Sequence, residues 1–299
     1  MLHKLLKINI LTISFLFLLT NSIHAGSKPV ELHQTIDPYL QANVEQRLKQ
    51  LGLSGAAQQK KLAITLIDIT DTDHPRVASV NGDTMMYAAS LPKIAILLGA
   101  FERIERGDML LDDELRDQLT QMIRYSSNKA ATEVLNRVGK EYLAELLQSP
   151  RFRLYDKDSN GGLWVGKEYG KGGAWKRDPL HNLSHGATAF QAARFYYLLE
   201  TGQLVSPALT EEMKEILSKP GIAHKFVKGL KAASPNAEIY RKSGSWRHWH
   251  ADSALVEHDG HRYIAVALAE DPKGGEWLSE LIVALDDLVL QPAPVAFLD

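Results

Sequence analysis

The chain has 299 residues, of which 45% are hydrophobic and 23% are charged. This composition is typical of a globular protein with one large core or two joined subdomains. The formal net charge of -2 gives no general electrostatic case for binding nucleic acid or an anionic membrane surface. There are no cysteines, which excludes disulfides, thiolate metal sites and cysteine nucleophiles.

The first residues are typical of an export signal. Lys4 and Lys7 give a positive start, residues 10–19 are almost wholly apolar, and Ala25 offers a small residue at the expected cut. The apolar run is too short to favour a membrane span. We therefore expect a signal peptide at residues 1–25 and a secreted or periplasmic mature protein without a stable membrane span; an uncleaved anchor is the alternative.

The N-terminal part of the mature chain predicts one helix and two strands. Apolar residues at helical spacing predict a helix over 32–53. Runs rich in β-branched residues then predict strands over 61–71 and 76–80, separated by a turn.

The middle of the chain is mainly helical. Helices are expected over 90–106, 113–124, 128–138, 140–147 and 188–201. The loop at 151–178 is too long for a simple connection, so we expect it to be a functional or lid segment.

The C-terminal part returns to strands after one further helix. The expected elements are a helix over 207–217, strands over 237–246, 253–258 and 262–269, and a closing helix over 277–288. Strands at both ends and helices between them indicate an α/β (α+β) fold with one antiparallel sheet flanked by helices. Within a single catalytic domain at 26–299, we expect a sheet subdomain from about 30–88 and 205–299 and an inserted all-helical subdomain at about 89–204.

Ser90 and Lys93 form the first candidate catalytic pair. Their spacing at a predicted helix start places the lysine one turn above the serine, on the same face. A serine alcohol needs a neighbour to take its proton, and burial among apolar side chains can lower the pKa of a lysine enough to do so. The alternative is that Ser90 caps the helix and Lys93 is solvated.

Two later groups add polar residues to this pair. Ser126 and Asn128 lie between two predicted helices, where side chains project from a corner; helix capping is the alternative. Lys242, Ser243 and Gly244 lie within a predicted strand, where a glycine often marks the close approach of a ligand or another backbone. A solvated lysine on an edge strand is the alternative there.

In this order, the three groups resemble those of the serine β-lactamase and penicillin-binding protein superfamily, with class A β-lactamases the nearest branch. The resemblance covers nearly all of the mature chain. It implies that Ser90 is the acylated nucleophile and that Lys93 shuttles its proton. It also implies that Ser126 relays a proton to the leaving nitrogen.

The resemblance also implies the substrate-binding residues. Asn128 would orient the shuttle lysine and hold the substrate amide. In the group that ends at Gly244, Lys242 would supply positive potential for the substrate carboxylate and Ser243 would hydrogen-bond it. The backbone N–H of Ser245 would join that of the nucleophile in an oxyanion hole.

The pattern departs from class A enzymes at the residue that hydrolyses the acyl-enzyme. There, a glutamate in an E-x-x-L-N setting activates water. Here the corresponding loop contains one glutamate, Glu168, which is followed by Tyr169 and Gly170 and not by Leu-Asn. Glu168 is either the catalytic base or a surface charge of the loop.

A second departure follows the K-S-G group, where Trp246 to His250 replace the expected small residues. The two aromatic side chains of this segment, with a cation between them, could grip a planar or carboxylated substrate. Strand alternation places Trp246, His248 and His250 on one face and Arg247 and Trp249 on the other. A metal site here is less favoured because no further ligand lies at an obvious spacing. We expect neither a metal nor a cofactor.

The favoured function is an exported serine acyl-hydrolase, a class A-like β-lactamase that opens the β-lactam ring through a Ser90 acyl-enzyme. The alternatives are a D-alanyl-D-alanine carboxypeptidase or esterase, and a non-hydrolytic penicillin-binding sensor. The substrate would be a small β-lactam or a peptidoglycan peptide. The altered glutamate setting favours the alternatives, whereas a free exported single domain suits a β-lactamase.

Overall fold

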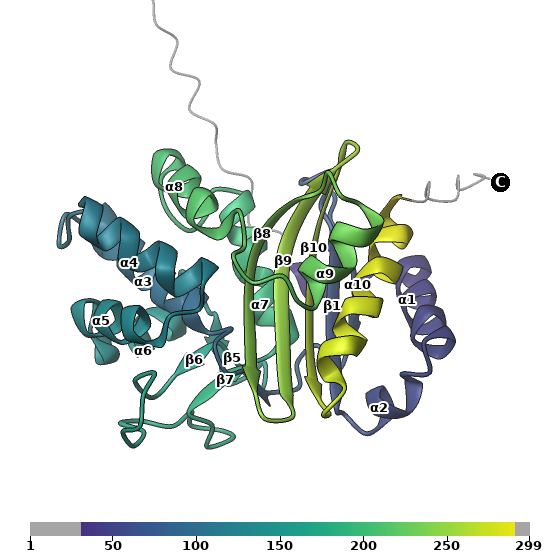
Figure 1. Cartoon of the computed structure of the whole chain (residues 1–299), viewed down its shortest axis with the longest axis horizontal. Helices are drawn as coiled ribbons and strands as arrows, with labels where there is room; N and C mark the ends of the chain where they lie inside the picture. The colour runs from purple at the N-terminus through teal and green to yellow at the C-terminus, as the bar shows by residue number, and fades with distance from the viewer. Residues whose placement is uncertain (1–30, 291–299) are drawn as a thin grey trace, which may run out of the picture. The chain divides into compact units, whose positions relative to one another are not determined.

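A five-stranded antiparallel sheet organises residues 31–290, the part of the chain that this computed structural model describes (Figure 1). The expected signal peptide lies outside the described residues. Strand β1, from the N-terminal part, pairs with β10, from the C-terminal part. Both ends of the chain therefore contribute to one sheet, as the sequence predicts. The strands, in sheet order, are β2 (Arg76–Val80), β1 (Leu62–Asp68), β10 (His261–Glu270), β9 (Trp249–His258) and β8 (Glu238–Trp246).

Helices cover both faces of the sheet. On one face, α1 (Pro38–Gln50), α9 (Phe226–Ala233) and α10 (Gly274–Leu290) bury their apolar side chains against the strands in one continuous core (Figure 1). On the other face, α7 (Ala189–Glu200) contacts β1, β9 and β10. Burial on both faces explains why every residue of β1 is buried and why its sequence is a near-continuous apolar run. Helix α7 falls in the range expected for the helical subdomain, but it packs on the sheet.

A second group of helices surrounds α3 (Lys93–Glu105). Every residue of α3 from Lys93 to Glu102 is buried, which fits its contacts with neighbouring helices on several sides. The helices around it are α4 (Asp113–Arg124), α5 (Asn128–Val138), α6 (Lys140–Gln148) and α8 (Pro207–Leu217).

Short elements connect these parts. They are η1 (Leu32–Gln34), α2 (Ser54–Gln58), β3 (Met86–Tyr87), β4 (Tyr155–Asp156), β5 (Gly161–Gly162), β6 (Trp164–Val165) and β7 (His185–Ala187). The first predicted helix starts later than expected, at Pro38, because the Asp37 side chain accepts from Leu40 N at 2.7 Å and caps it. Helix α9 is not predicted, and β9 starts at Trp249 and not at residue 253.

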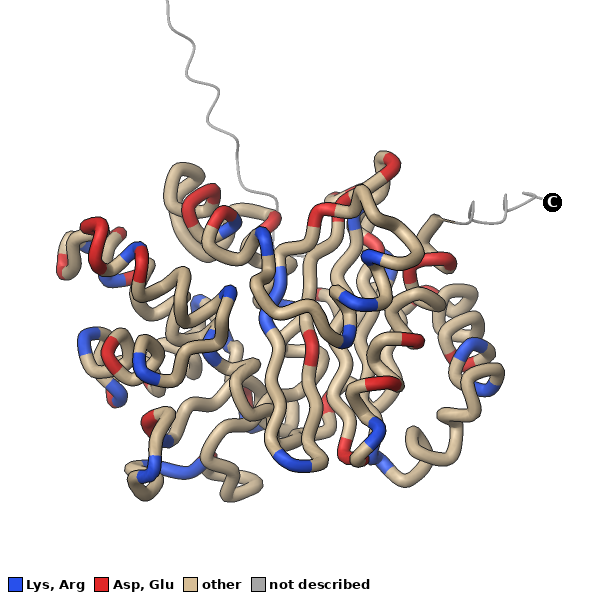
Figure 2. Tube along the Cα trace, in the orientation of Figure 1, with Lys and Arg blue, Asp and Glu red and all other residues tan. Residues whose placement is uncertain are grey.

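Charged residues lie mainly outside the strands. Figure 2 shows the central strands as mostly uncharged, with acidic and basic residues interspersed over the helices and turns. Asp68, Arg241, Lys242 and Asp252 are buried exceptions within the strands, and Lys93 is buried in α3. Among the described residues, no helix is long and apolar enough to cross a membrane.

Candidate active site

Ser90 lies in a tight turn between β3 and α3. Leu91 N donates to Ala88 O at 3.0 Å, and Lys93 N donates to Ser90 O at 3.3 Å. Helix α3 itself begins at Lys93, so the predicted start near Ser90 is about one turn early. Ala89 has a φ of 49°, a left-handed conformation that a residue with a Cβ adopts at an energetic cost.

Strand β8 passes directly against this turn at Gly244. A Cβ on Gly244 would lie 2.1 Å from Ala88 O and 2.9 Å from Ser90 N. Only a glycine allows the two backbones to approach this closely. A glycine in a strand was expected to mark the close approach of a ligand or of another backbone, and here it marks another backbone. This approach brings Ser245 beside the Ser90 turn.

Lys93 is fully buried, so the solvated alternative is wrong for this residue. Its Nζ donates to Ser126 O at 2.7 Å, to Asn128 Oδ1 at 2.9 Å and to Ser127 O at 3.3 Å, and lies 3.5 Å from Ser126 Oγ. Burial lowers the pKa of Lys93 to about 7. A substantial fraction of this side chain is therefore neutral near pH 7 and able to accept a proton.

The capping role in the Ser-Ser-Asn group belongs to Ser127. Its side chain accepts from Ala130 N at 3.2 Å at the start of α5. Ser126, whose φ is 57°, lies just outside the helix, and Asn128 is its first residue. The neighbouring serine satisfies the helix terminus, so the side chains of Ser126 and Asn128 are available to the lysine.

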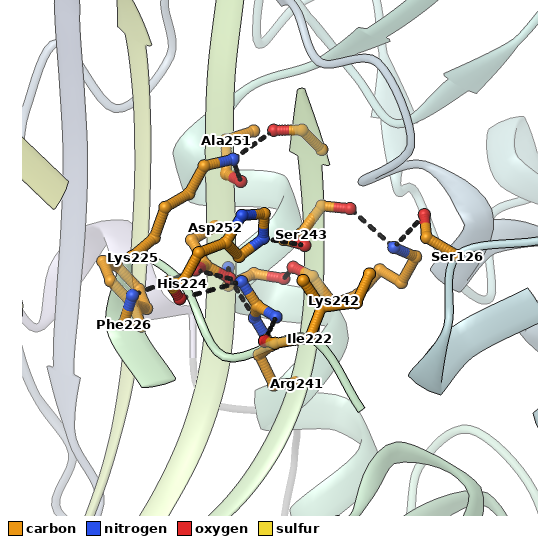
Figure 3. Close-up of polar contacts among 12 residues, drawn as sticks. Ser126, Ile222, His224, Lys225, Phe226, Arg241, Lys242, Ser243, Ala251 and Asp252 are labelled. Carbon is orange, nitrogen blue, oxygen red and sulfur yellow. Dashed lines mark hydrogen bonds and ion pairs between the residues drawn. The ribbon is translucent and has the colours of Figure 1, made fainter. Parts of the chain in front are cut away.

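Lys242 reaches Ser126 from the strand side. Its buried Nζ donates to Ser126 Oγ at 3.0 Å and to Ser243 O at 2.6 Å (Figure 3). Burial, reinforced by the nearby Lys93, lowers the pKa of Lys242 well below its ordinary value. The hydroxyl of Ser126 thus has a lysine amine on either side, at 3.0 Å and 3.5 Å.

A cavity of about 350 Å³ opens beside this cluster. It brings together residues from distant segments of the chain. Among them are Ser90, which was expected to be acylated, and Asn128 and Ser245, which were expected to bind the substrate. Its lining includes Ser90, Asn128, Ser245, Glu168, Tyr169, Tyr87, His185 and Trp246. Ser243 is not among the lining residues; its Oγ lies 3.2 Å from His224 Nε2 (Figure 3).

The loop that carries Glu168 is closed at its base. Trp175 N and Lys176 N both donate to Gly166 O, at 3.0 and 3.2 Å, and Trp164 Nε1 donates to Lys176 O at 3.0 Å. A Cβ on Gly166 would lie 1.9 Å from Lys176 O, so the base of the loop requires a glycine at this position. The expected functional segment at 151–178 thus contains a compact loop that forms one wall of the cavity.

Within this loop, Glu168 and Tyr169 have different surroundings. The Glu168 carboxylate pairs with Lys140 Nζ at the start of α6, and its side chain is 41% exposed. The Tyr169 ring lies over Lys93 Nζ, 4.5 Å from the ring centroid, and its hydroxyl donates to Ala89 O at 3.4 Å. Burial raises the pKa of Tyr169 well above its usual value. Sequence reasoning missed Tyr169, although it directly follows the one glutamate of the loop.

The segment after Ser245 is a hairpin and not a continuing strand. Trp246 pairs with Trp249, so Arg247 and His248 form a two-residue turn, with a φ of 53° at Arg247. The expected placement of Trp246, His248 and His250 along one strand face is therefore wrong. Within residues 31–290, no cluster of three or more His, Cys, Asp or Glu is arranged to hold a metal ion.

Known proteins match this chain in sequence pattern and in fold. The model of the beta-lactamase enzyme family matches residues 43–118 and 114–291. The structure of PBP-A has 18% sequence identity and a TM-score of 0.65 over 82% of this chain and 95% of its own. A PBP-A variant solved as an acyl-enzyme complex with penicillin G matches with the same identity, TM-score and share of this chain, and 96% of its own.

A beta-lactamase from Sphaerobacter thermophilus is similar in fold, with 16% identity and a TM-score of 0.64 over 85% of this chain and 97% of its own. No curated protein matches the sequence. The family match covers most of the chain and both sides of the cavity. From it we conclude that the chain belongs to the beta-lactamase enzyme family, within the serine β-lactamase and penicillin-binding protein superfamily, and is a serine hydrolase-type enzyme.

Proposed function

We propose that the protein is an exported, penicillin-recognising D-alanyl-D-alanine peptidase that forms an acyl-enzyme on Ser90. With a β-lactam, the same serine is acylated and the product leaves slowly. The observation that carries this proposal is the position of Tyr169, whose ring lies over the amine of Lys93.

Acylation follows from the groups around Ser90. Neutral Lys93 takes the proton of Ser90 Oγ as this oxygen bonds to the substrate carbonyl carbon. The carbon–nitrogen bond of the peptide or lactam then breaks, and the leaving nitrogen receives a proton through Ser126 Oγ. The hydroxyl can serve as this relay because Lys93 and Lys242 lie on either side of it.

Two further groups would act on the substrate. The backbone N–H groups of Ser90 and Ser245 would stabilise the negative charge that develops on the carbonyl oxygen, a contribution of about 3 kcal/mol for each donor. The positive charge of Lys242 would attract the substrate carboxylate. The hydroxyl of Ser243 has no part in this proposal, because it lies beside His224 and outside the cavity lining.

Hydrolysis of the resulting ester needs a base for water, and a carboxylate in this role typically accelerates such a step by about 10²–10⁴-fold. The Glu168 carboxylate is paired with Lys140. Tyr169, with its raised pKa, is protonated at neutral pH and cannot serve as the base. Lys93 is left as the base for deacylation, so the ester with a β-lactam should persist.

The likeness to PBP-A supports this proposal, because a variant of that protein was solved as an acyl-enzyme with penicillin G. Export is part of the proposal, since peptidoglycan peptides lie outside the cytoplasmic membrane. The expected signal peptide supports it.

A class A-like β-lactamase is the second candidate. It is favoured by one observation, namely that Glu168 lines the same cavity as Ser90. In that case the glutamate would leave Lys140 and activate water, and the protein would contribute to antibiotic resistance.

One assay separates the two candidates. Purified protein is incubated with a chromogenic cephalosporin while colour and intact mass are followed, and a D-Ala-D-Ala peptide is tested in parallel. A stoichiometric adduct that persists, together with release of D-alanine from the peptide, supports the peptidase. Sustained turnover of the cephalosporin without a lasting adduct supports the β-lactamase.

A further inference from the structure

A third buried lysine lies behind the strand that borders Ser90. Lys225 is 3% exposed, and its Nζ donates to Gly244 O, to Ser245 Oγ at 2.8 Å and to Ala251 O at 3.0 Å (Figure 3). Gly244 and Ala251 face each other on β8 and β9. The ammonium group therefore joins the two strands where β8 meets the Ser90 turn.

A buried ion pair fixes the segment that carries this lysine. The side chains of Arg241 and Asp252, 3% and 0% exposed, form two hydrogen bonds of 2.7 Å (Figure 3). Arg241 also donates to Ile222 O at 3.0 Å and to His224 O at 3.4 Å, and Asp252 accepts from Phe226 N at 3.2 Å.

The backbone on either side of Lys225 is thus anchored to β8 and β9. This anchoring holds the lysine at a φ of 51°, a conformation that is unfavourable for a residue with a side chain. A buried ion pair is weak evidence for stability on its own. What matters here is that the pair fixes the position of Lys225.

The carbonyl of Gly244 and the N–H of Ser245 belong to the same peptide unit. A cation that donates to this carbonyl polarises the unit and makes the N–H a stronger donor, since hydrogen bonds in series strengthen one another at low dielectric. The bond also prevents the peptide plane from turning.

We propose that Lys225 is a positioning residue for the oxyanion hole, which fixes and polarises the Gly244–Ser245 peptide so that its N–H faces the reacting carbonyl oxygen. This inference rests on the proposed acylation of Ser90. Lys225 itself does not line the cavity, so its effect passes through the strand backbone.

The charge on Lys225 depends on pH in an accessible range. Burial lowers its pKa to about 8; Asp252 opposes this shift and Arg241 adds to it. The other titratable groups that sense it are His224, His250 and Lys242. The ammonium is therefore mostly charged at pH 7 and becomes neutral above about pH 8.

The first test replaces the charge while keeping the length of the side chain. In Lys225→Met, the acylation rate constant for a chromogenic cephalosporin should fall roughly tenfold, less than the ~10²–10³ typical of losing a whole donor. The apparent KM should change little, because substrate binding is left intact. Lys225→Arg should recover part of the loss, and Lys228→Met, on the exposed side of α9, should leave the rate unchanged. Acylation by Lys225→Met at the wild-type rate would overturn the inference.

The second measurement does not depend on enzyme activity, and its main readout comes from the wild-type protein. In the wild-type protein, the NMR resonance of the Ser245 backbone amide nitrogen should move upfield between about pH 6 and pH 10, as the bond to Gly244 O loses its charge. In Lys225→Arg, the part of this movement that follows a pKa of about 8 should be lost, because arginine remains charged. A Ser245 resonance that ignores pH in the wild type overturns the inference, whereas failure of the wild type to acylate at all overturns only the proposed function.

Discussion

The two walls of the cavity differ in how their polar groups are satisfied. On the wall formed by the Ser90 turn and β8, amines, hydroxyls and backbone groups from three distant segments meet within hydrogen-bonding distance. On the wall formed by the loop at 166–176, the carboxylate is occupied by Lys140, and an aromatic ring takes the place beside Lys93. The groups that we propose for acylation are thus gathered on the first wall, whereas the glutamate of the second wall is held away from Lys93 by its ion pair with Lys140.

The largest effect should come from the nucleophile. Ser90→Ala should abolish the mass adduct with a cephalosporin entirely, because the oxygen that forms the ester is gone. Intact-protein mass spectrometry checks this, with the melting temperature as a control for folding. An adduct of the same mass on the variant would place the nucleophile elsewhere.

On the first wall, a single added methyl group can separate β8 from the Ser90 turn. In Gly244→Ala, the new Cβ would meet Ala88 O at 2.1 Å, and backbone on both sides cannot move away easily. Acylation should slow by at least about 10²-fold, as for a lost oxyanion donor, and the free energy of unfolding should fall by about 1–3 kcal/mol. Stopped-flow acylation and urea unfolding measure the two effects. A variant with wild-type values for both would contradict the geometry.

The second wall can be given a carboxylate next to Lys93, as the β-lactamase candidate would require. Tyr169→Glu places a carboxylate next to Lys93 and should speed release of the cephalosporin product by at least about tenfold, within the usual range for a general base. Tyr169→Phe is the matched control, which keeps the ring and removes only the hydroxyl bond to Ala89. Release is measured as the return of the unmodified mass after excess substrate is removed. Equal release rates in the two variants would argue that the position of the Tyr169 ring is not the cause of slow product release.

The pH dependence of acylation tests the first wall without a mutation. Burial lowers the pKa of Lys93 to about 7, and only the neutral amine can take the serine proton. The acylation rate should therefore rise about tenfold between pH 6 and pH 8, following the neutral fraction. A rate that is flat over this range would mean that another group accepts the proton.

The smallest effect is expected at Glu168. Its ion pair with Lys140 is partly exposed, and such pairs contribute at most about 1 kcal/mol. Glu168→Gln should change acylation and release less than about threefold. Single-turnover mass measurements over time provide the check. Release that slows by two orders of magnitude would instead make Glu168 the base and favour the β-lactamase.

Much of the fold could be predicted because local signals agree with it. Helices α4, α5 and α8 have the predicted bounds, since Asp112 and Ser127 cap the first two and Pro207 begins the third. The hairpin turn at Asp259 and Gly260 also lies in the gap between the predicted strands over 253–258 and 262–269.

The site was less accessible to sequence reasoning, for a physical reason. The order of motifs indicated Ser90 and its partners, but the roles of Tyr169 and Lys225 depend on how two irregular segments are placed, one beside the cavity and one behind β8. Tyr169 depends on a loop closed by Gly166, and Lys225 on a backbone held by Arg241. Neither segment has a periodicity that a sequence can reveal.

Three buried lysines around one strand have a thermodynamic consequence for the protein as a whole. The pKa of Lys93 is about 7 and that of Lys225 about 8, and that of Lys242 is also lowered, whereas each returns to its ordinary value near 10.5 when the chain unfolds. Unfolding should therefore take up protons between about pH 7 and pH 10, and by linkage these three groups make the folded state more stable as the pH rises through that window. The fold thus holds these three buried amines at a cost in stability that grows as the pH falls through this window.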